Sequence, residues 1–301
     1  MSRASMNHSV RSWRSKLINP VIGKEFRLRM RTPRSMWSLF FYLLAIGVFA
    51  FGFIYVTTVL SSQNSAVFDP NRSQIMFYFI TAVQLGLVAF MAPGLTAGVI
   101  SGEREKQTLN LLLTTQQSST TIIVSKLVAS LSFMLLLVAA TLPVYSVVFL
   151  YGGISPREML LVFLFFIFLM IVLGSLGIMF STLFKRTMVS VIVTYGVTLF
   201  IFAGTGFLYL IMEQIMAGIS RNSASGALDY GWVGHFAAFN PVAALVSIFE
   251  PDVTSRVFHV SGGQYHWPLW TEFVIIYLVL SLGAIMTAIR YIRPNYRRKA
   301  D

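Results

Sequence analysis

Six long stretches without a charged side chain, each bounded by charged residues, dominate this sequence. Counted between the bounding charges, they are 34–69, 72–103, 126–157, 158–185, 186–213 and 272–290. A helix needs about 20 apolar residues to cross the hydrocarbon core of a membrane. Because lipid offers no partner for backbone N–H and C=O groups, each stretch must satisfy them internally, as a helix does. The pattern predicts an all-α integral membrane protein with six transmembrane helices.

The composition excludes a water-soluble protein. Charged residues make up 11% and hydrophobic residues 56% of the chain, whereas soluble domains carry about a quarter charged residues. The chain has no cysteine, so a disulfide or a thiolate metal site is excluded. Residues 1–35 are polar and basic and hold no apolar signal core, so no cleaved signal peptide is expected.

The basic residues are distributed unequally between the two sides of the predicted spans. Of 23 lysines and arginines, four fall on one side: Arg72, Arg157, Arg221 and Arg256. The remaining nineteen of the 23 fall on the other side, which the positive-inside rule assigns to the cytoplasm. We therefore expect a multi-pass protein of the cell membrane with both termini in the cytoplasm. The net charge of +12 is a topology signal, and no basic patch interleaved with aromatic residues indicates a nucleic-acid partner.

These boundaries divide the chain into three segments. Residues 1–35 are a basic cytoplasmic segment, 36–290 hold the six spans with an outer loop at 213–271, and 291–301 are a basic cytoplasmic tail. In the first segment, Asn19-Pro20 predicts a helix start, and the residues that follow are amphipathic. We expect an interfacial helix in the headgroup layer, with charges that include Lys24, Glu25, Arg27 and Arg31. The alternative is a simple topology anchor.

The connection between the second and third spans combines charge with an apolar stripe. Three glycines, spaced to let another helix approach closely, end the second span: Gly94, Gly98 and Gly102. A charged cluster, 103–106, comes next. A leucine stripe then lies on one face of a short predicted helix: Leu109, Leu112 and Leu113. Such a helix suits either the groove of a partner protein or the surface of the bilayer, and its amphipathic pattern alone does not decide between them.

The stretch from Gly102 to Thr115 reads Gly-Glu-Arg-Glu-Lys-Gln-Thr-Leu-Asn-Leu-Leu-Leu-Thr-Thr. It resembles the coupling segment of ABC transporter permeases of the type-2 exporter superfamily, typically Glu-Arg-Glu-x-Gly-Thr-Leu-x-x-Leu-Leu-x-Thr-Pro. Gln107 stands where that family usually has glycine. Residues 19–29 are similar to the family's N-terminal interfacial helix, and Asn240-Pro241 is similar to a recurrent Asn/Ser-Pro motif before the last span. The resemblance covers nearly the whole chain and is closest to permeases of multi-copper enzyme maturation systems.

The resemblance implies a division of labour between subunits. Two permease subunits, identical or different, form the membrane half of an exporter, and separate ATPase subunits dock on the coupling helices. It implies that eight residues couple this chain to the ATPase: Glu103, Arg104, Glu105, Lys106, Thr108, Leu109, Leu112 and Leu113.

The chain itself is expected to be neither an enzyme nor a cofactor-binding protein. It has no Gly-x4-Gly-Lys-Ser/Thr loop whose backbone cradles phosphates, so ATP is expected on the partner. The sequence 260–264, Val-Ser-Gly-Gly-Gln, echoes the ABC ATPase signature, but Ser-Gly-Gly is ordinary turn chemistry. No His-Glu-x-x-His motif supports an intramembrane enzyme. A non-transporting membrane scaffold or sensor anchor is the alternative function.

The sequence offers few polar side chains as candidates for binding a cargo or a metal. Gln84 is the clearest polar residue inside a span, and such a residue marks either a pathway or a helix contact. The scarcity of ionisable residues in the spans argues against a proton-coupled pump and suits a lipophilic or amphipathic cargo, whose binding residues the sequence does not reveal. The outer-loop histidines His235, His259 and His266 lack the spacing of metal ligands, so no metal site is expected.

Overall fold

The computed structural model describes residues 33–56, 70–109, 118–150, 154–222, 231–258 and 267–292. Within these ranges the chain forms helices and no strand. Six helical stretches are long and apolar enough to cross a membrane: Met36–Tyr55, Ser73–Glu105, Ser119–Leu150, Pro156–Leu183, Thr187–Ser220 and Leu269–Tyr291. The all-α fold with six predicted spans is therefore confirmed.

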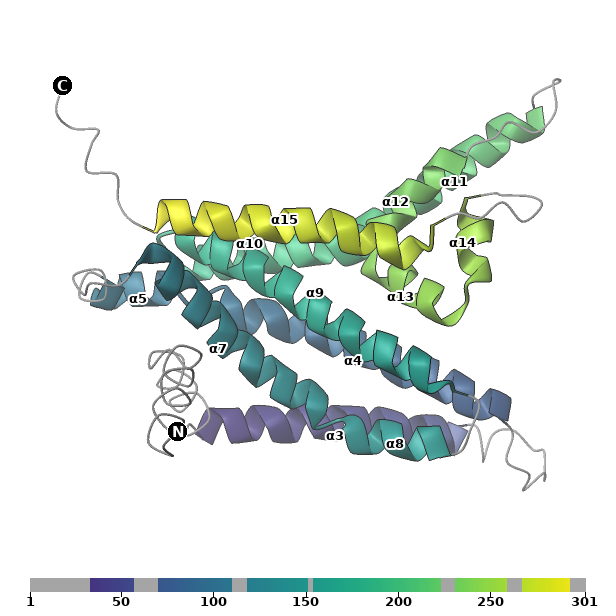
Figure 1. The fold of residues 1–301 in the computed structure, drawn as a ribbon, viewed down its shortest axis with the longest axis horizontal. Coiled ribbons are helices and arrows are strands. Elements are labelled where there is room, and N and C mark those ends of the chain that lie inside the picture. Colours follow the sequence, from purple (N-terminus) through teal and green to yellow (C-terminus); the bar gives the residue numbers. More distant parts are fainter. Residues whose placement is uncertain are drawn as a thin grey trace, which may run out of the picture.

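The first three spans and the connection that follows the second contain five labelled helices (Figure 1). They are α3 (Pro33–Tyr55), α4 (Pro70–Thr96), α5 (Ser101–Glu105), α7 (Ser119–Ala139) and α8 (Leu142–Leu150). The remaining elements are α9 (Pro156–Leu183), α10 (Thr187–Leu199), the π-helix η2 (Phe200–Gly204), α11 (Thr205–Asn222), the 3-10 helix η3 (Gly231–Val233), α12 (Gly234–Ala238), α13 (Pro241–Phe249), α14 (Asp252–Val257) and α15 (Leu269–Tyr291).

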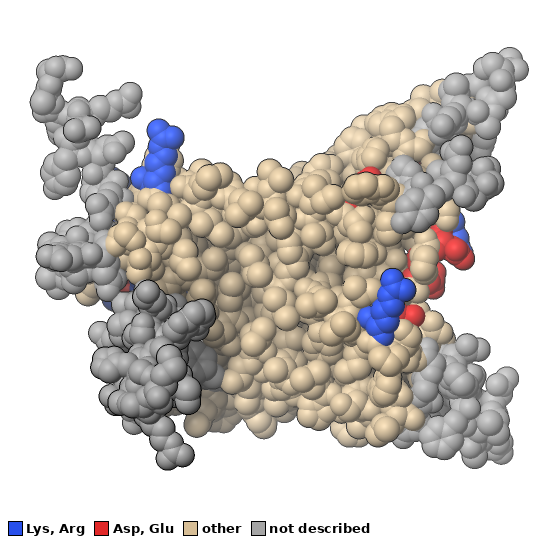
Figure 2. Space-filling model, viewed as in Figure 1, with Lys and Arg blue, Asp and Glu red and all other residues tan. Residues whose placement is uncertain are grey.

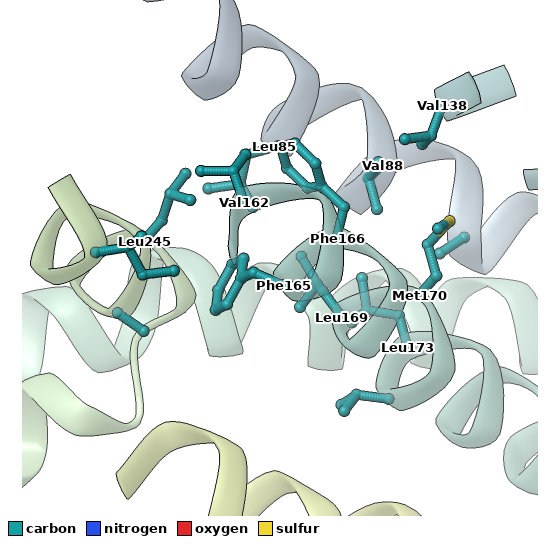
Figure 3. Close-up of a cluster of buried hydrophobic side chains, with 14 of the residues drawn as sticks. Leu85, Val88, Val138, Val162, Phe165, Phe166, Leu169, Met170, Leu173 and Leu245 are labelled. Carbon is teal, nitrogen blue, oxygen red and sulfur yellow. The ribbon is translucent and has the colours of Figure 1, made fainter. Parts of the chain in front are cut away.

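The helix α9 is the centre of the bundle and packs against α4, α7, α10, α13 and α15. Its inward side chains, including Val162, Phe166, Leu169 and Leu173, are fully buried. Figure 3 shows them meeting side chains from α4, α7 and α13. Since lipid is as apolar as these side chains, association depends on close packing and interhelical hydrogen bonds rather than on water exclusion.

On the face shown in Figure 2 the charged side chains lie at the two ends of the bundle, and the surface between them is uncharged. One end carries α5 together with the start of α3 and the end of α15, and the other carries α14 (Figure 1). We call them the α5 end and the α14 end. Large apolar side chains such as Trp37, Phe41 and Phe51 of α3 are exposed along the flanks, as expected where lipid is the solvent.

One helix start has a clear local signal in the sequence, Ser155-Pro156 with Glu158 three residues after the serine, and two helix boundaries depart from the charges that bound the predicted spans. Ser155 and Glu158 form the capping box that starts α9, with each side chain bonded to the other residue's backbone N–H. The third span begins earlier than the predicted boundary at Lys126, because α7 starts at Ser119. The fifth helix runs past the predicted end at Glu213, to Asn222.

The predicted outer loop contains a bent pair of short helices. The segments Gly231–Ala238 and Pro241–Phe249 are bent by 105° relative to each other. Asn240 stands at the bend and its side chain accepts hydrogen bonds from the first amides of α13. Each segment is too short to cross a membrane by itself, so the bent pair forms either a broken span or a re-entrant loop.

Gln84 is fully buried in α4 and joins it to the break in the third span. Its Oε1 accepts a hydrogen bond of 3.0 Å from the hydroxyl of Thr141, which lies between α7 and α8. Its Nε2 has no hydrogen-bond partner among the described residues. The observed bond supports a helix contact for this residue, one of the two roles that the sequence left open.

Candidate coupling site

The short helix α5 begins against the fourth span. The backbone N–H groups of Ile100 and Ser101 both donate to the Ser181 hydroxyl of α9, at 2.8 and 3.0 Å. Ile100, the residue that precedes the helix, offers no side-chain cap. The first amides of a helix lack intrahelical acceptors, so Ser181 supplies one from a distant part of the chain and fixes where α5 starts.

Glu103 points toward the third span. Its Oε1 lies 2.5 Å from Lys126 Nζ, in the second turn of α7. The Lys126 side chain is only 5% exposed and that of Glu103 29% exposed. A lysine is almost never buried unless it is paired, so this ion pair explains how an apolar helix accommodates Lys126 in its interior.

Arg104 and Glu105 meet the turn between the fourth and fifth spans. The Arg104 guanidinium donates to the carbonyl of Phe184, at the end of α9, over 3.4 Å. The Glu105 carboxylate accepts from the backbone N–H of Thr187 at 2.7 Å and from its hydroxyl at 2.8 Å. A cation at a helix C-terminus and an anion at a helix N-terminus both complement the helix dipole. Glu105 thus caps α10, whose own N-cap residue makes no side-chain cap bond.

The glycines at the end of the second span lie against α10, as their spacing predicted. A Cβ on Gly94 would be 3.0 Å from the Tyr195 hydroxyl, and one on Gly98 would be 3.2 Å from Thr187 Cγ2. Two hydrogen bonds use the same close approach. Tyr195 donates to the Phe90 carbonyl at 2.9 Å, and Ser190 donates to the Ala97 carbonyl at 2.6 Å. We call this contact between the end of α4, α5 and α10 the glycine seam.

The residues after α5 divide into exposed and buried positions. Lys106 and Thr108 are exposed, and the Thr108 hydroxyl donates to the Glu103 carbonyl. Leu109 is buried among Ile100, Ile122 and other apolar residues of this chain. Leu109 therefore packs internally in this structure. The other two leucines of the predicted stripe, Leu112 and Leu113, lie outside the described residues.

Gln107 has φ of 58°, in the left-handed region. An L-residue pays a steric cost there that glycine does not. This is the position where the typical coupling segment has glycine, so the structure gives the physical reason for that preference. Gln107 forms the tight turn between α5 and the helical residues 108–109, and its own backbone is strained there.

Several predicted site residues fall outside the described part of the chain. These are the charges of the interfacial helix (Lys24, Glu25, Arg27 and Arg31) and two of the histidines (His259 and His266). The third histidine, His235, pairs with Glu272, with 3.1 Å between Nδ1 and Oε2. Among the described residues no cluster of three or more histidine or acidic side chains is arranged to hold a metal ion.

Three residues that position α5 were not recognised in the sequence: Ser181, Thr187 and, as a partner of Glu103, Lys126. For Lys126 the sequence carries a signal, a lysine beside an apolar stretch, but that signal predicts a span boundary. Only the start of α7 at Ser119 shows that this lysine lies inside the helix and needs an acidic partner. Ser181 and Thr187 carry no such signal, since single hydroxyl residues at helix ends are common.

A family model described as ABC-2 family transporter protein matches residues 19–293. The chain belongs to the ABC-2 transporter family. This confirms the resemblance seen in residues 102–115. No match was found among curated proteins. As an ABC-2 family member the chain is the membrane component of an ABC transporter, a permease, and not its ATPase. The family match does not distinguish the multi-copper maturation subgroup.

Proposed function

We propose that this ABC-2 permease is one half of the membrane domain of an ATP-driven exporter, and that a separate ABC ATPase docks at the α5 end. The observation that carries the proposal is the anchoring of α5. Glu103 holds it to α7, Arg104 to α9 and Glu105 to α10. A displacement of α5 by a docked partner therefore reaches the third, fourth and fifth spans together.

The finer parts of the proposal are supported by the distribution of basic residues, the lack of a phosphate-binding loop in the sequence and the resemblance to type-2 exporter permeases. The α5 end faces the cytoplasm of a cell membrane, with both termini on that side. ATP binds the partner, and this chain binds no cofactor. A second permease, identical or different, completes the pathway. Alternating access requires one half to move against the other, and the nucleotide drives that motion only through contacts that differ between two states. The uncharged flank favours a lipophilic or amphipathic cargo.

The test is ATP hydrolysis in liposomes by the purified permease, by its ATPase and by the two together, with crosslinking at Lys106→Cys. We expect no turnover by the permease alone, altered turnover in the complex, and a crosslink to the ATPase from position 106. Arg157→Cys, at the α14 end, is the control and should form no crosslink. A stable complex with unchanged turnover and no crosslink from position 106 would favour a non-transporting scaffold instead.

A further inference from the structure

The fifth span is interrupted by a π-helix, η2, between α10 and α11. The Thr205 N–H bonds back to the Phe200 carbonyl, five residues earlier. A π-turn widens the helix locally and leaves a backbone carbonyl accessible to a partner from outside the helix. Here the carbonyl of Phe202 accepts a hydrogen bond of 2.8 Å from Asn240 Nδ2. The interruption therefore coincides with a contact to another element.

Asn240 uses both ends of its amide. Its Oδ1 accepts from the N–H groups of Val242 at 2.8 Å and Ala243 at 3.3 Å, which caps α13. Its Nδ2 binds the π-helix. The residue is 5% exposed, and a buried amide with both groups paired is strongly held in one orientation. One side chain thus joins the bend between α12 and α13 to the middle of the fifth span.

The surroundings are shaped to this amide. A Cβ at Gly206 would lie 2.8 Å from Asn240 Nδ2, so any larger residue at that position would displace the amide. The other side of the bent pair is held by α15. Tyr277 donates to the Phe239 carbonyl at 2.8 Å, and the Trp270 N–H donates to the Ser247 hydroxyl at 3.1 Å. The bent pair is therefore fixed between the fifth and sixth spans.

We propose that Asn240 is a positioning residue that ties the bent pair α12–α13 to the π-helix of the fifth span. The far end of that span, α10, is held to α5 by Glu105. A movement of α5 thus shifts α10, and the Asn240 bond carries the shift to the bent pair at the α14 end. The role in transport rests on the proposed function, whereas the tie itself does not.

Substitutions at Asn240 separate the tie from the cap. Asn240→Ser keeps a side-chain oxygen that caps α13, because serine is as good an N-cap as asparagine, but it removes the amide donor to Phe202. Asn240→Ala removes both. Gly206→Ala displaces the amide from the other side. Gly218→Ala is the matched control, because Gly218 is on the same helix α11 and a Cβ there meets nothing within 4 Å.

The measurement is pulsed electron paramagnetic resonance between spin labels at Leu210→Cys on α11 and Val246→Cys on α13, in nanodiscs. Both positions are exposed, and the chain has no native cysteine. In the lone permease we expect a narrow distance distribution that broadens in Asn240→Ser and Gly206→Ala but not in Gly218→Ala. The double variant Asn240→Ser/Gly206→Ala should show no more broadening of the distance distribution than either single variant. An unchanged distribution in Asn240→Ser, or equal effects of Gly206→Ala and Gly218→Ala, would overturn the tie.

The same labels in the complex with the ATPase test the transmission. We expect ATP with vanadate to shift the distribution in the wild-type complex, and we expect that shift to be lost in Asn240→Ser while the thermal stability stays near that of wild type. The lone permease could show the tie while the wild-type complex shows no nucleotide-dependent shift. That result would contradict the proposed function but not the tie. A normal shift in Asn240→Ser would refute the transmission.

Discussion

Gln107 occupies a left-handed backbone conformation, with φ of 58°, that costs an L-residue about 1–2 kcal/mol. Glycine avoids this cost but loses more conformational freedom on folding, about 0.5–1 kcal/mol. We therefore expect Gln107→Gly to stabilise the permease by up to about 1 kcal/mol, and Gln107→Val, which is β-branched, to destabilise it. Thermal unfolding in nanodiscs measures both, and a Gly variant less stable than the Val variant would contradict the strained turn.

The pair Glu103–Lys126 predicts a large energetic coupling between two residues 23 positions apart. Removing one partner of a buried ion pair leaves the other charge poorly solvated and costs about 3 kcal/mol. Glu103→Gln should therefore lower the stability strongly, as should Lys126→Met, whose methionine also leaves Glu103 without its cation.

The double variant Glu103→Gln/Lys126→Met is the decisive control, because neutral residues at both positions need no charge compensation. Its loss of unfolding free energy should be smaller than the summed losses of the two single variants by about 1–3 kcal/mol, measured by the same unfolding assay. Additive losses would show that the two side chains act independently.

At the scale of elements, the glycine seam makes α5 and α10 a single unit. Glu105 supplies the acceptors for the first turn of α10 through Thr187. Glu105→Ala should increase hydrogen exchange at the first amides of α10 and reduce the response of ATP turnover to the permease in the complex. Lys106→Ala, at the adjacent exposed position, is the matched control and should leave the α10 amides unchanged. Equal exchange in the two variants would mean that Glu105 does not cap α10.

The six spans could be predicted from the sequence because each must be uncharged over its length in lipid, and the capping box at Ser155 because its signal is local. The start of α7 could not, because the rule that charges mark span ends fails where a lysine finds a partner, as Lys126 does in Glu103. The partners of Glu105 and Asn240 depend on helix packing between residues 38 to 82 positions apart. A local pattern carries no information about such contacts.

The bend between α12 and α13 was likewise predictable from the sequence only in part. Asn240-Pro241 has the residue types that favour a helix start, because asparagine caps and proline fits the first turn, and α13 begins at Pro241. The π-helix that receives the other end of the same amide is not encoded by any strong local signal in residues 200–204, which are apolar or small. The start of α13 was therefore predictable in part, and its attachment to the fifth span was not.

At the scale of the whole molecule, charge separates the two ends of the bundle. The described basic side chains at the α5 end include Arg104, Lys106 and Lys126, whereas Arg157 and Arg256 belong to the α14 end, and the flank between the ends in Figure 2 is uncharged. Because lysine and arginine accumulate on the cytoplasmic side of membrane proteins, we expect the α5 end to face the cytoplasm.

Single cysteines test this orientation directly, since the native chain contains none. Lys106→Cys and Arg157→Cys replace exposed residues at opposite ends, so neither should disturb packing. In sealed cells a membrane-impermeant maleimide should label position 157, whereas position 106 should react only after the membrane is permeabilised. Labelling of both positions from outside would refute the six-span topology, because a single span, the third, separates positions 106 and 157 and so places them on opposite sides. Labelling of position 106 alone would show the opposite orientation. The α5 end and the proposed ATPase contact would then lie outside the cell, where no ATP is available.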